Sequence, residues 1–314
     1  MSKRVVIALG GNALGSTISE QAEVVKETVK VIAGLIRGGY EVIVTHGNGP
    51  QVGMIQKAFT ALKNAEPDKY EFCPLDVCAA MSQGYVGYDL TRALTNELEH
   101  QGIDKQVTMV LTRTEVDPED PSFADPSKPI GAFVTPEQAQ HLTNTRGFVY
   151  KEDAGRGLRR VVPSPMPVRI VELDSIKRLV KEGQVVICCG GGGIPVIRNE
   201  EGDLQGVEAV IDKDNASCTL AMELGADFLV ILTAVEKVAI NFGKPDQQWL
   251  DQITVEEAHR YIGENQFAPG SMLPKVEAAI RFAQSGEGRT ALITLLEKAG
   301  DGLSGKTGTR IIEK

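Results

Sequence analysis

The chain has 314 residues, 42% of them apolar and 24% charged, a composition typical of a folded protein with a large hydrophobic core. Its 33 basic and 42 acidic residues give a formal net charge of -9, which argues against nucleic acid or an anionic membrane as the main partner. Only a short apolar run precedes Gly10, too short for a signal peptide, and no later stretch approaches the length of a spanning helix. We therefore expect a soluble, cytoplasmic protein.

The cysteines and histidines give no sign of a disulfide framework or a metal centre. The five cysteines are odd in number, and no two of them form a C-x-x-C pair. The four histidines are scattered, and none pairs with another at the spacing of metal ligands. We expect reduced, mostly buried thiols and no metal held by the protein's own side chains.

Three predicted strands share one pattern, an apolar run that ends directly in a glycine-rich loop. They are Val5 to Leu9 before Gly10, Gly11 and Asn12; Val42 to His46 before Gly47, Asn48 and Gly49; and Val185 to Cys189 before Gly190, Gly191, Gly192 and Gly193. Continuous β-branched runs suit central parallel strands covered by helices on both faces. Because the carboxyl ends of such strands bind ligands, and bare loops let backbone N–H groups approach an anion, the recurrence predicts one shared anion site.

Helices and further strands alternate along the rest of the chain. Apolar residues at helical spacing predict helices over 20–37, 52–62 and 74–100, and a strand is predicted over 106–112. After residue 167 we predict helices over 173–181 and 213–224, a strand over 228–232, helices from Thr254 and Ser271, and a strand over 291–294. Strands that alternate with helices imply an α/β fold in which a parallel sheet is sandwiched between helices.

Residues 117–167 differ in composition from the rest of the chain. They hold eight of the fifteen prolines, and their strand signals are short. The sequence TPEQ, residues 135–138, predicts the start of a helix over 136–142, with threonine as the cap and proline in the first turn. Because loops of this length are uncommon in compact domains, we favour an inserted, protruding subdomain or lid over a merely long loop. The core would then comprise residues 1–116 and 168–314.

Two glycine motifs resemble known phosphate-binding loops, but the first fails in its own pattern and the second in its context. Gly190 to Gly193 fails the G-x-G-x-x-G dinucleotide pattern, because Pro195 or Val196 stands where the last glycine is required. GDGLSGKT, Gly300 to Thr307, satisfies G-x-x-x-x-G-K-[ST], but only seven residues follow it and no helix can form there. A Rossmann oxidoreductase is therefore disfavoured, and we interpret Lys306 as a turn lysine.

Three lysines are better candidates for an anion site. Lys213, followed by Asp214, stands at the junction between a strand and a helix N-terminus, where free N–H groups and the helix dipole favour an anion. Lys275 lies about one turn into the helix that starts near Ser271. Two such lysines could grip one phosphate chain, whereas either alone is more typical of a solvated surface residue. Lys128, in the proline-rich insert, is either a lid lysine that closes over substrate or a surface charge.

Specific sequence blocks are distributed over essentially the whole chain: ALGGNAL, HGNGPQVG, AAMSQGYVGY, DPSKPIG, YKEDAGRG, RRVVPSP, CGGGGIPVI, VEAVIDKD, GSMLPKVEAAI and GKTGTRI. In these blocks the chain resembles the carbamate kinases of the amino acid kinase superfamily. The resemblance implies an αβα sandwich around a mostly parallel open sheet, a protruding subdomain and a homodimer. It also implies reversible phosphoryl transfer from ATP to carbamate, giving ADP and carbamoyl phosphate, with Mg²⁺ bound with the nucleotide. The family commonly runs this reaction toward ATP during arginine degradation.

Carried over position by position, the resemblance implies three groups of site residues. The carbamate and phosphoryl site would be lined by Gly10, Gly11, Asn12, Gly47, Asn48 and Gly49, with Gly192 and Gly193 from the third glycine loop. The phosphates would be stabilised by Lys213 and Lys275, with Asp214 orienting these lysines and Lys128 reaching in from the lid. The nucleotide pocket would include Ala234, Val235 and Met272. The chain departs from the usual pattern of the insert at Ala132, Val134 and Leu158.

The implied reaction suits the residues that are present. A carbamate oxygen is already an anion, so its attack on a γ-phosphoryl group needs alignment and charge neutralisation rather than a general base. This agrees with glycine loops and lysines in an acidic protein that has no convincing histidine or cysteine nucleophile. Two alternatives stay open. One is a kinase acting on glutamate or N-acetylglutamate, which would need a roomier acceptor site; the other is a homologue that binds ligands without turnover.

Overall fold

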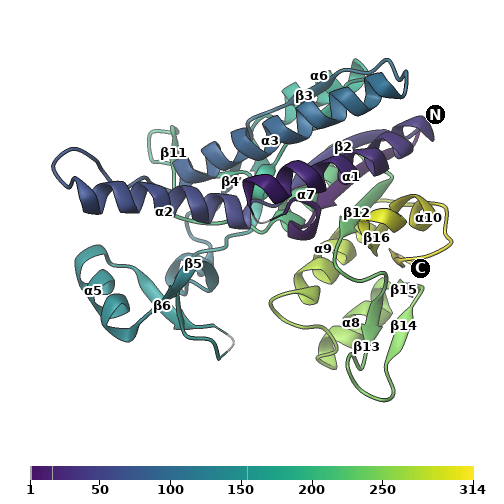
Figure 1. The fold of residues 1–314 in the computed structure, drawn as a ribbon. Helices are drawn as coiled ribbons and strands as arrows, with labels where there is room; N and C mark the ends of the chain where they lie inside the picture. The colour runs from purple at the N-terminus through teal and green to yellow at the C-terminus, as the bar shows by residue number, and fades with distance from the viewer. Residues whose placement is uncertain (1, 16, 154) are drawn as a thin grey trace.

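The computed structural model describes residues 2–15, 17–153 and 155–314, and an eight-stranded sheet lies at its centre (Figure 1). The strand order is β15-β17-β16-β12-β1-β2-β9-β3. In that order the bounds are Gln252–Thr254, Thr309–Ile312, Thr290–Thr294, Phe228–Leu232, Arg4–Leu9, Glu41–His46, Val185–Ile187 and Val107–Met109. All neighbours run parallel except β16 and β17, which are antiparallel. The predicted, mostly parallel sheet is therefore confirmed.

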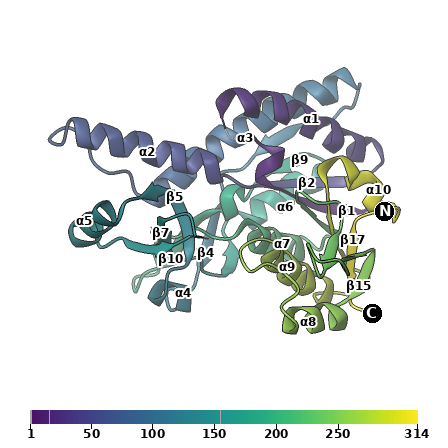
Figure 2. The same ribbon diagram turned by 60° about the horizontal axis from the view of Figure 1, so that its bottom comes forward.

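Helices cover both faces of this sheet because its central strands are apolar on both sides. Val5 and Ile7 of β1 belong to one core, whereas Val6 between them belongs to the other. The first core is completed by α1 (Ile18–Arg37), α3 (Leu75–His100) and α10 (Ala299–Leu303). The second is completed by α6 (Leu173–Lys181), α7 (Lys213–Glu223), α8 (Val255–Gly263) and α9 (Met272–Gln284). Figure 2 shows α1 and α3 on one side of the strands and α7, α8 and α9 on the other, which confirms the predicted αβα sandwich.

The stretch 117–167 forms a small sheet of its own in the order β5-β7-β6, with antiparallel neighbours. Its strands are Lys128–Val134, Leu158–Val162 and Val149–Glu152, and its helices are α4 (Pro121–Ala124) and α5 (Pro136–Arg146). The Thr135 cap and the side chain of Gln138 form a capping box at the start of α5, so the predicted helix is confirmed and extends to Arg146. In both views α5 and β5 lie beside α2 (Gly49–Ala65), on the side of the molecule away from α8 and α10.

Two further small sheets complete the fold. One has the order β11-β10-β4-β8, with bounds Leu204–Gly206, Ile194–Arg198, Arg113–Val116 and Pro167–Ile170. The other is the hairpin of β13 (Val238–Ile240) and β14 (Gln248–Leu250). Short 3-10 turns occur at η1 (Gly11–Ala13), η2 (Gly190–Gly192) and η3 (Leu296–Lys298). Within the described ranges, no helix is both long enough and apolar enough to cross a membrane.

The strand predicted over 106–112 is shorter in the structure, where β3 covers only Val107–Met109. Thr112 lies outside the strand, and its backbone forms hydrogen bonds with Gln83 of α3. The N–H of Thr112 donates to Oε1 of Gln83 (2.9 Å), and Nε2 of Gln83 donates to the carbonyl oxygen of Thr112 (3.0 Å). The hydroxyl oxygen of Thr112 accepts from the N–H of Cys189 (3.0 Å). Thr112 therefore joins α3 to the loop that follows β9, next to the glycine loops.

Candidate active site

The three glycine loops meet at the carboxyl edge of the main sheet. Leu9, the last residue of β1, lies opposite His46, the last residue of β2. The N–H of Gly47 donates to the carbonyl oxygen of Leu9 (3.0 Å), so the first two loops start side by side. The third loop packs on the second, because a Cβ added to Gly191 would lie 2.1 Å from Nδ2 of Asn48. The structure brings the loops together as the sequence predicts, and anion binding there stays a prediction.

The third loop depends on glycine for close packing. Gly192 has a φ of 90°, and a Cβ on it would lie 2.4 Å from the carbonyl oxygen of Ile211. A Cβ on Gly193 would lie 2.0 Å from Oγ1 of Thr114. These two glycines hold the backbone of the loop against the residues before α7 and against β4. Any contact of theirs with a phosphate stays a prediction.

Lys213, Asp214 and Lys275 form an ion-paired cluster beside these loops. Nζ of Lys213 lies 2.5 Å from Oδ1 of Asp214, and Nζ of Lys275 lies 2.8 Å from Oδ2 of the same carboxylate. The Asp214 side chain is 3% exposed, and those of Lys213 and Lys275 are 14% and 15% exposed. A Cβ on Gly47 would lie 3.5 Å from Cδ of Lys213, which places the cluster against the second glycine loop.

Two helix N-termini hold this cluster. Lys213 is the first residue of α7, and Oδ1 of the preceding Asp212 accepts the N–H of Asp214 (2.9 Å) as an N-cap. Lys275 lies in the first turn of α9, after Pro274. Both helices pack in the same core, and Asp214 contacts both lysines, so the two N-termini converge. The positive ends of the helix dipoles add to the two ammonium groups.

Burial and charge oppose each other within the cluster. Burial lowers the pKa of Lys213, while the charge of Asp214 raises it and that of Lys275 lowers it further. Burial alone would raise the pKa of Asp214, but attraction to both lysines lowers it to about 2. Asp214 is therefore ionised at neutral pH, and its charge opposes the loss of a proton from Lys213.

Lys128 reaches the same region from β5. Its Nζ lies 2.8 Å from Oδ2 of Asp212, the residue whose other oxygen caps α7. Asp212 therefore connects the stretch 117–167 to the lysine cluster. The structure brings Lys128 to the candidate site, and its action as a lid lysine stays a prediction.

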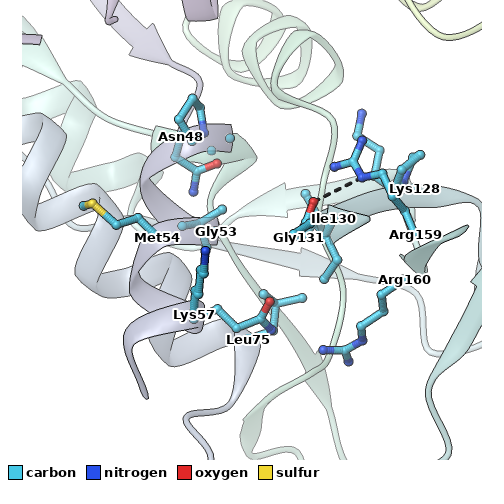
Figure 3. Close-up of a pocket in the computed structure, with 18 of the residues that line it drawn as sticks. Asn48, Gly53, Met54, Lys57, Leu75, Lys128, Ile130, Gly131, Arg159 and Arg160 are labelled. Atoms are coloured by element: carbon cyan, nitrogen blue, oxygen red, sulfur yellow. Dashed lines mark hydrogen bonds between the residues drawn. The ribbon is translucent and has the colours of Figure 1, made fainter. Parts of the chain in front are cut away.

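A cavity of about 1490 Å³ collects most of these residues. Its lining includes Gly47, Asn48, Gly49, Lys128, Gly191, Asp212, Lys213, Asp214 and Lys275. Figure 3 shows Asn48, Gly53 and Lys57 on one side of this space and Lys128 and Gly131 on the other. The cavity thus opens between the carboxyl edge of the sheet, α2 and the stretch 117–167.

Several predicted site residues lie outside the lining of this cavity as far as the structure describes it. They are Gly10 and Gly11 of the first loop, Gly192 and Gly193 of the third, and the predicted nucleotide residues Ala234, Val235 and Met272. Asn12 belongs to η1, but its side chain lies outside the described part of the chain. Ala234 and Val235 follow β12 at the carboxyl edge, and Met272 starts α9 beside the cavity residues Ser271 and Pro274. Contact of these residues with a nucleotide stays a prediction.

The structure adds residues that the sequence analysis missed. Asp212 could have been found as the aspartate just before a predicted helix start, a preferred cap residue. Ser82 of α3 was not predicted either: its Oγ accepts from Nδ2 of the predicted site residue Asn48 (2.7 Å), which fixes Asn48 between α3 and the third loop. Lys57 and Arg160 line the cavity from α2 and β7, and neither stands in a spacing that indicates a site.

His46 is a buried, neutral packing residue between two glycine loops. Burial lowers its pKa to about 4, although Nδ1 lies 2.7 Å from the carbonyl oxygen of Gly47. A Cβ on Gly190 would lie 2.5 Å from the ring, so the imidazole fills the space between the second and third loops. In the part of the chain that the structure describes, no carboxylate pairs with this ring, so a protonated imidazole would be a buried, uncompensated charge.

We therefore expect acid to destabilise the protein through His46. The unfolded chain takes up the proton near pH 6.5 but the folded chain only near pH 4, so stability falls as pH decreases between these values. Between about pH 7.5 and 4.5 the loss from this group should be roughly 2 to 3 kcal/mol. Urea unfolding at both pH values measures this decrease in the free energy of unfolding. The decrease should be smaller in His46→Asn than in wild type, and it should be unchanged in the control His141→Asn, whose side chain is exposed. Equal pH dependence in wild type and His46→Asn would refute the assignment.

Lys306 lies in a surface turn, which confirms its interpretation from the sequence. Its side chain is 72% exposed, and Nζ lies 3.3 Å from Oδ1 of Asp301. The motif Gly300 to Thr307 begins inside α10 and leads into β17, so it has no helix after it. Lys306→Ala should change phosphoryl-transfer turnover by less than about threefold and the free energy of unfolding by no more than roughly 0.5 kcal/mol. A hundredfold loss of activity in the folded variant would instead place the nucleotide phosphates at this turn.

Comparison with known proteins agrees with this geometry. Residues 3–294 match the Amino acid kinase family. The chain is 58% identical over 313 residues to the carbamate kinase-like protein YqeA of Escherichia coli K12, covering 100% of both chains. It is 53% identical over 312 residues to a carbamate kinase of Staphylococcus haemolyticus, covering 99% of each chain. A carbamate kinase from Giardia lamblia bound to AMP-PNP superposes with a TM-score of 0.92 at 43% identity, covering 99% of this chain and 98% of that one. The chain therefore belongs to the amino acid kinase family, among its carbamate kinases and carbamate kinase-like proteins.

Proposed function

We propose that this protein is a carbamate kinase, which transfers the γ-phosphoryl group of ATP to carbamate and, in reverse, makes ATP from carbamoyl phosphate and ADP. The observation that carries the proposal is the cluster of Lys213, Asp214 and Lys275, which is held at two helix N-termini and lines a cavity at the carboxyl edge of the sheet. Full-length similarity to proteins named carbamate kinase supports the same reaction.

In this mechanism the protein supplies alignment and positive charge. The carbamate oxygen carries a negative charge, so it attacks the γ-phosphorus without a general base. Lys213 and Lys275 neutralise the charge that accumulates on the phosphoryl oxygens, and the glycine loops allow backbone N–H groups to approach them. Asp214 holds both ammonium groups in place and is a positioning residue, since each of its oxygens is occupied by a lysine.

Mg²⁺ is proposed to bind with the nucleotide rather than to a protein site. In the described ranges, no group of three or more histidine, cysteine, aspartate or glutamate side chains could hold a metal. Of the cavity carboxylates, Asp212 and Asp214 pair with lysines and Glu208 pairs with Arg160. This fits the preference of Mg²⁺ for substrate phosphates and water, with few protein ligands. The ion would neutralise phosphate charge.

We further propose that the stretch 117–167 acts as a lid. If it seals the site, binding of ADP with a carbamoyl phosphate analogue should protect its backbone amides from hydrogen exchange. Lys128→Ala should impair turnover more than ADP binding, because the lysine would contact the phosphoryl end of the substrates. Lys151→Ala, on the same stretch but outside the cavity lining, is the matched control. Unchanged exchange on ligand binding would leave this stretch with a structural role only.

A coupled assay of ATP formation from ADP and carbamoyl phosphate tests the proposal directly. We expect turnover with carbamoyl phosphate and none in the forward direction with glutamate or N-acetylglutamate as acceptor. One relative is named only carbamate kinase-like. This favours, as a specific alternative, a protein that binds the ligands but does not catalyse the reaction. That alternative would be supported if calorimetry detected ADP binding while the assay detected no ATP.

The cellular setting is proposed on the same basis. We propose a cytoplasmic homodimer that runs toward ATP in arginine degradation, as the resemblance implies. All five cysteines are free in the structure, which suits a reducing compartment. Light scattering on the purified protein should give about twice the chain mass of 33.8 kDa.

A further inference from the structure

Part of the cavity has no role in the proposed phosphoryl transfer. Its volume of about 1490 Å³ exceeds the range of roughly 300 to 1,000 Å³ that is common for small-molecule sites. Beyond the lysine cluster it is lined by Lys57 of α2, Arg146 of α5 and Arg160 of β7, which we name the insert-side cations. Figure 3 shows Lys57 and Arg160 on opposite sides of this space, near Leu75.

The insert-side cations carry more charge than their surroundings neutralise. Nη2 of Arg160 lies 2.6 Å from Oε2 of Glu208, whose other oxygen accepts the N–H of Leu75 (2.8 Å). Among the described residues, Lys57 and Arg146 have no carboxylate within ion-pair distance. Two positive charges are therefore in excess here, in a protein whose net charge is -9. Such a local positive potential in a cleft attracts anions.

Aromatic rings hold the two arginines in position. Cζ of Arg146 lies 3.5 Å from the ring centroid of Phe72, and Cζ of Arg160 lies 3.5 Å from that of Phe148. A guanidinium group that stacks through its face keeps its N–H edge for a carboxylate or phosphate, which it can bind through two hydrogen bonds. Among the described residues Arg146 has no hydrogen-bond partner on this edge, whereas Nη2 of Arg160 already donates to Glu208. Preorganisation of this kind reduces the entropy that a bound anion would cost.

We propose that the insert-side cations bind a small organic anion with two or more carboxylate or phosphate groups. More than one group is required because the three cations come from three different elements, and Figure 3 shows Lys57 and Arg160 on opposite sides of the space. Apolar lining residues such as Leu75 and Ile130 would contact a carbon skeleton. Because Lys57 belongs to α2 and the arginines to the stretch 117–167, the bound anion would hold this stretch against α2. These cations come from α2, α5 and β7, whereas the lysine cluster comes from α7 and α9, and both sets line the same cavity. The proposal does not depend on the proposed function.

Calorimetric titration in Mg²⁺-free chloride buffer tests this site. The probes are propane-1,2,3-tricarboxylate and 2,3-bisphosphoglycerate, with acetate and inorganic phosphate as single-group anions. We expect at least one multivalent probe to bind more tightly than its single-group counterpart. Lys57→Gln and Arg146→Gln should each weaken this binding about tenfold, as expected for the loss of one charge-assisted contact. The matched controls Lys63→Gln on α2 and Arg156→Gln near β7, both outside the cavity lining, should leave it within about twofold.

A Lys213→Ala variant separates the two sites. Multivalent binding that persists in Lys213→Ala and is weakened by Lys57→Gln would support the proposal, and the probe that binds would identify carboxylate or phosphate as the preferred group. Binding lost in Lys213→Ala but unchanged in Lys57→Gln would place the anion at the lysine cluster and overturn it. So would the absence of binding by both multivalent probes up to about 10 mM. Circular dichroism of each variant verifies that it is folded.

Discussion

Lys213→Ala and Lys275→Ala should each lower the turnover of phosphoryl transfer by about 10²- to 10³-fold, the usual effect of removing one preorganised charge-stabilising donor. Both ammonium groups are largely removed from solvent and are fixed by one carboxylate, so water cannot replace either of them in the same geometry. The KM for ADP should change less than the turnover number, because the lysines act where charge develops. Steady-state rates of ATP formation measure both effects.

Two controls keep this result interpretable. Lys177→Ala removes an exposed lysine of α6 and should retain wild-type turnover. Lys213→Arg keeps the charge but changes the shape of the donor, so it should recover only part of the lost activity. Circular dichroism and urea unfolding establish that each variant is folded. Near-wild-type turnover in either alanine variant would remove that lysine from the mechanism.

Asp214→Asn should have the second large effect, on both activity and stability. The amide has nearly the shape of the carboxylate, but it leaves Lys213 and Lys275 close together without a negative charge between them. Loss of one partner from a buried ionic cluster costs about 3 to 5 kcal/mol of stability. Turnover should fall about 10²-fold, because the lysines lose their fixed orientation. Urea unfolding and the coupled assay measure the two effects.

The pH profile distinguishes a positioning role from a merely structural one. Because Asp214 raises the pKa of Lys213, its removal should lower that pKa further. The lysine then loses its proton at lower pH, so the alkaline decline in turnover should begin at lower pH in Asp214→Asn than in wild type. Asp301→Asn, which removes the surface partner of Lys306, should leave the profile unchanged. A lower rate with the same alkaline limb would show that Asp214 does not control the charge of Lys213.

The sequence by itself determined the local elements around the site. Continuous β-branched runs favour buried strands, and the glycines after them end each strand in a bare loop. The start of α5 was predictable because a capping box is formed by residues three apart, Thr135 and Gln138. The position of Lys213 at the start of α7 followed from the same kind of local signal, a strand that passes directly into a helical pattern.

Only the tertiary structure decided which of these residues meet. Lys275 and Asp214 are 61 positions apart and come together because α7 and α9 bury their apolar faces in one core. Lys128 and Asp212 are 84 positions apart, and Asp212 was not recognised as a site residue because its partner lies in the distant strand β5. Hydrophobic periodicity states which face of an element is buried but not against which other element, since the hydrophobic effect is not directional. The convergence of Lys57, Arg146 and Arg160 on one cavity depends on that packing in the same way.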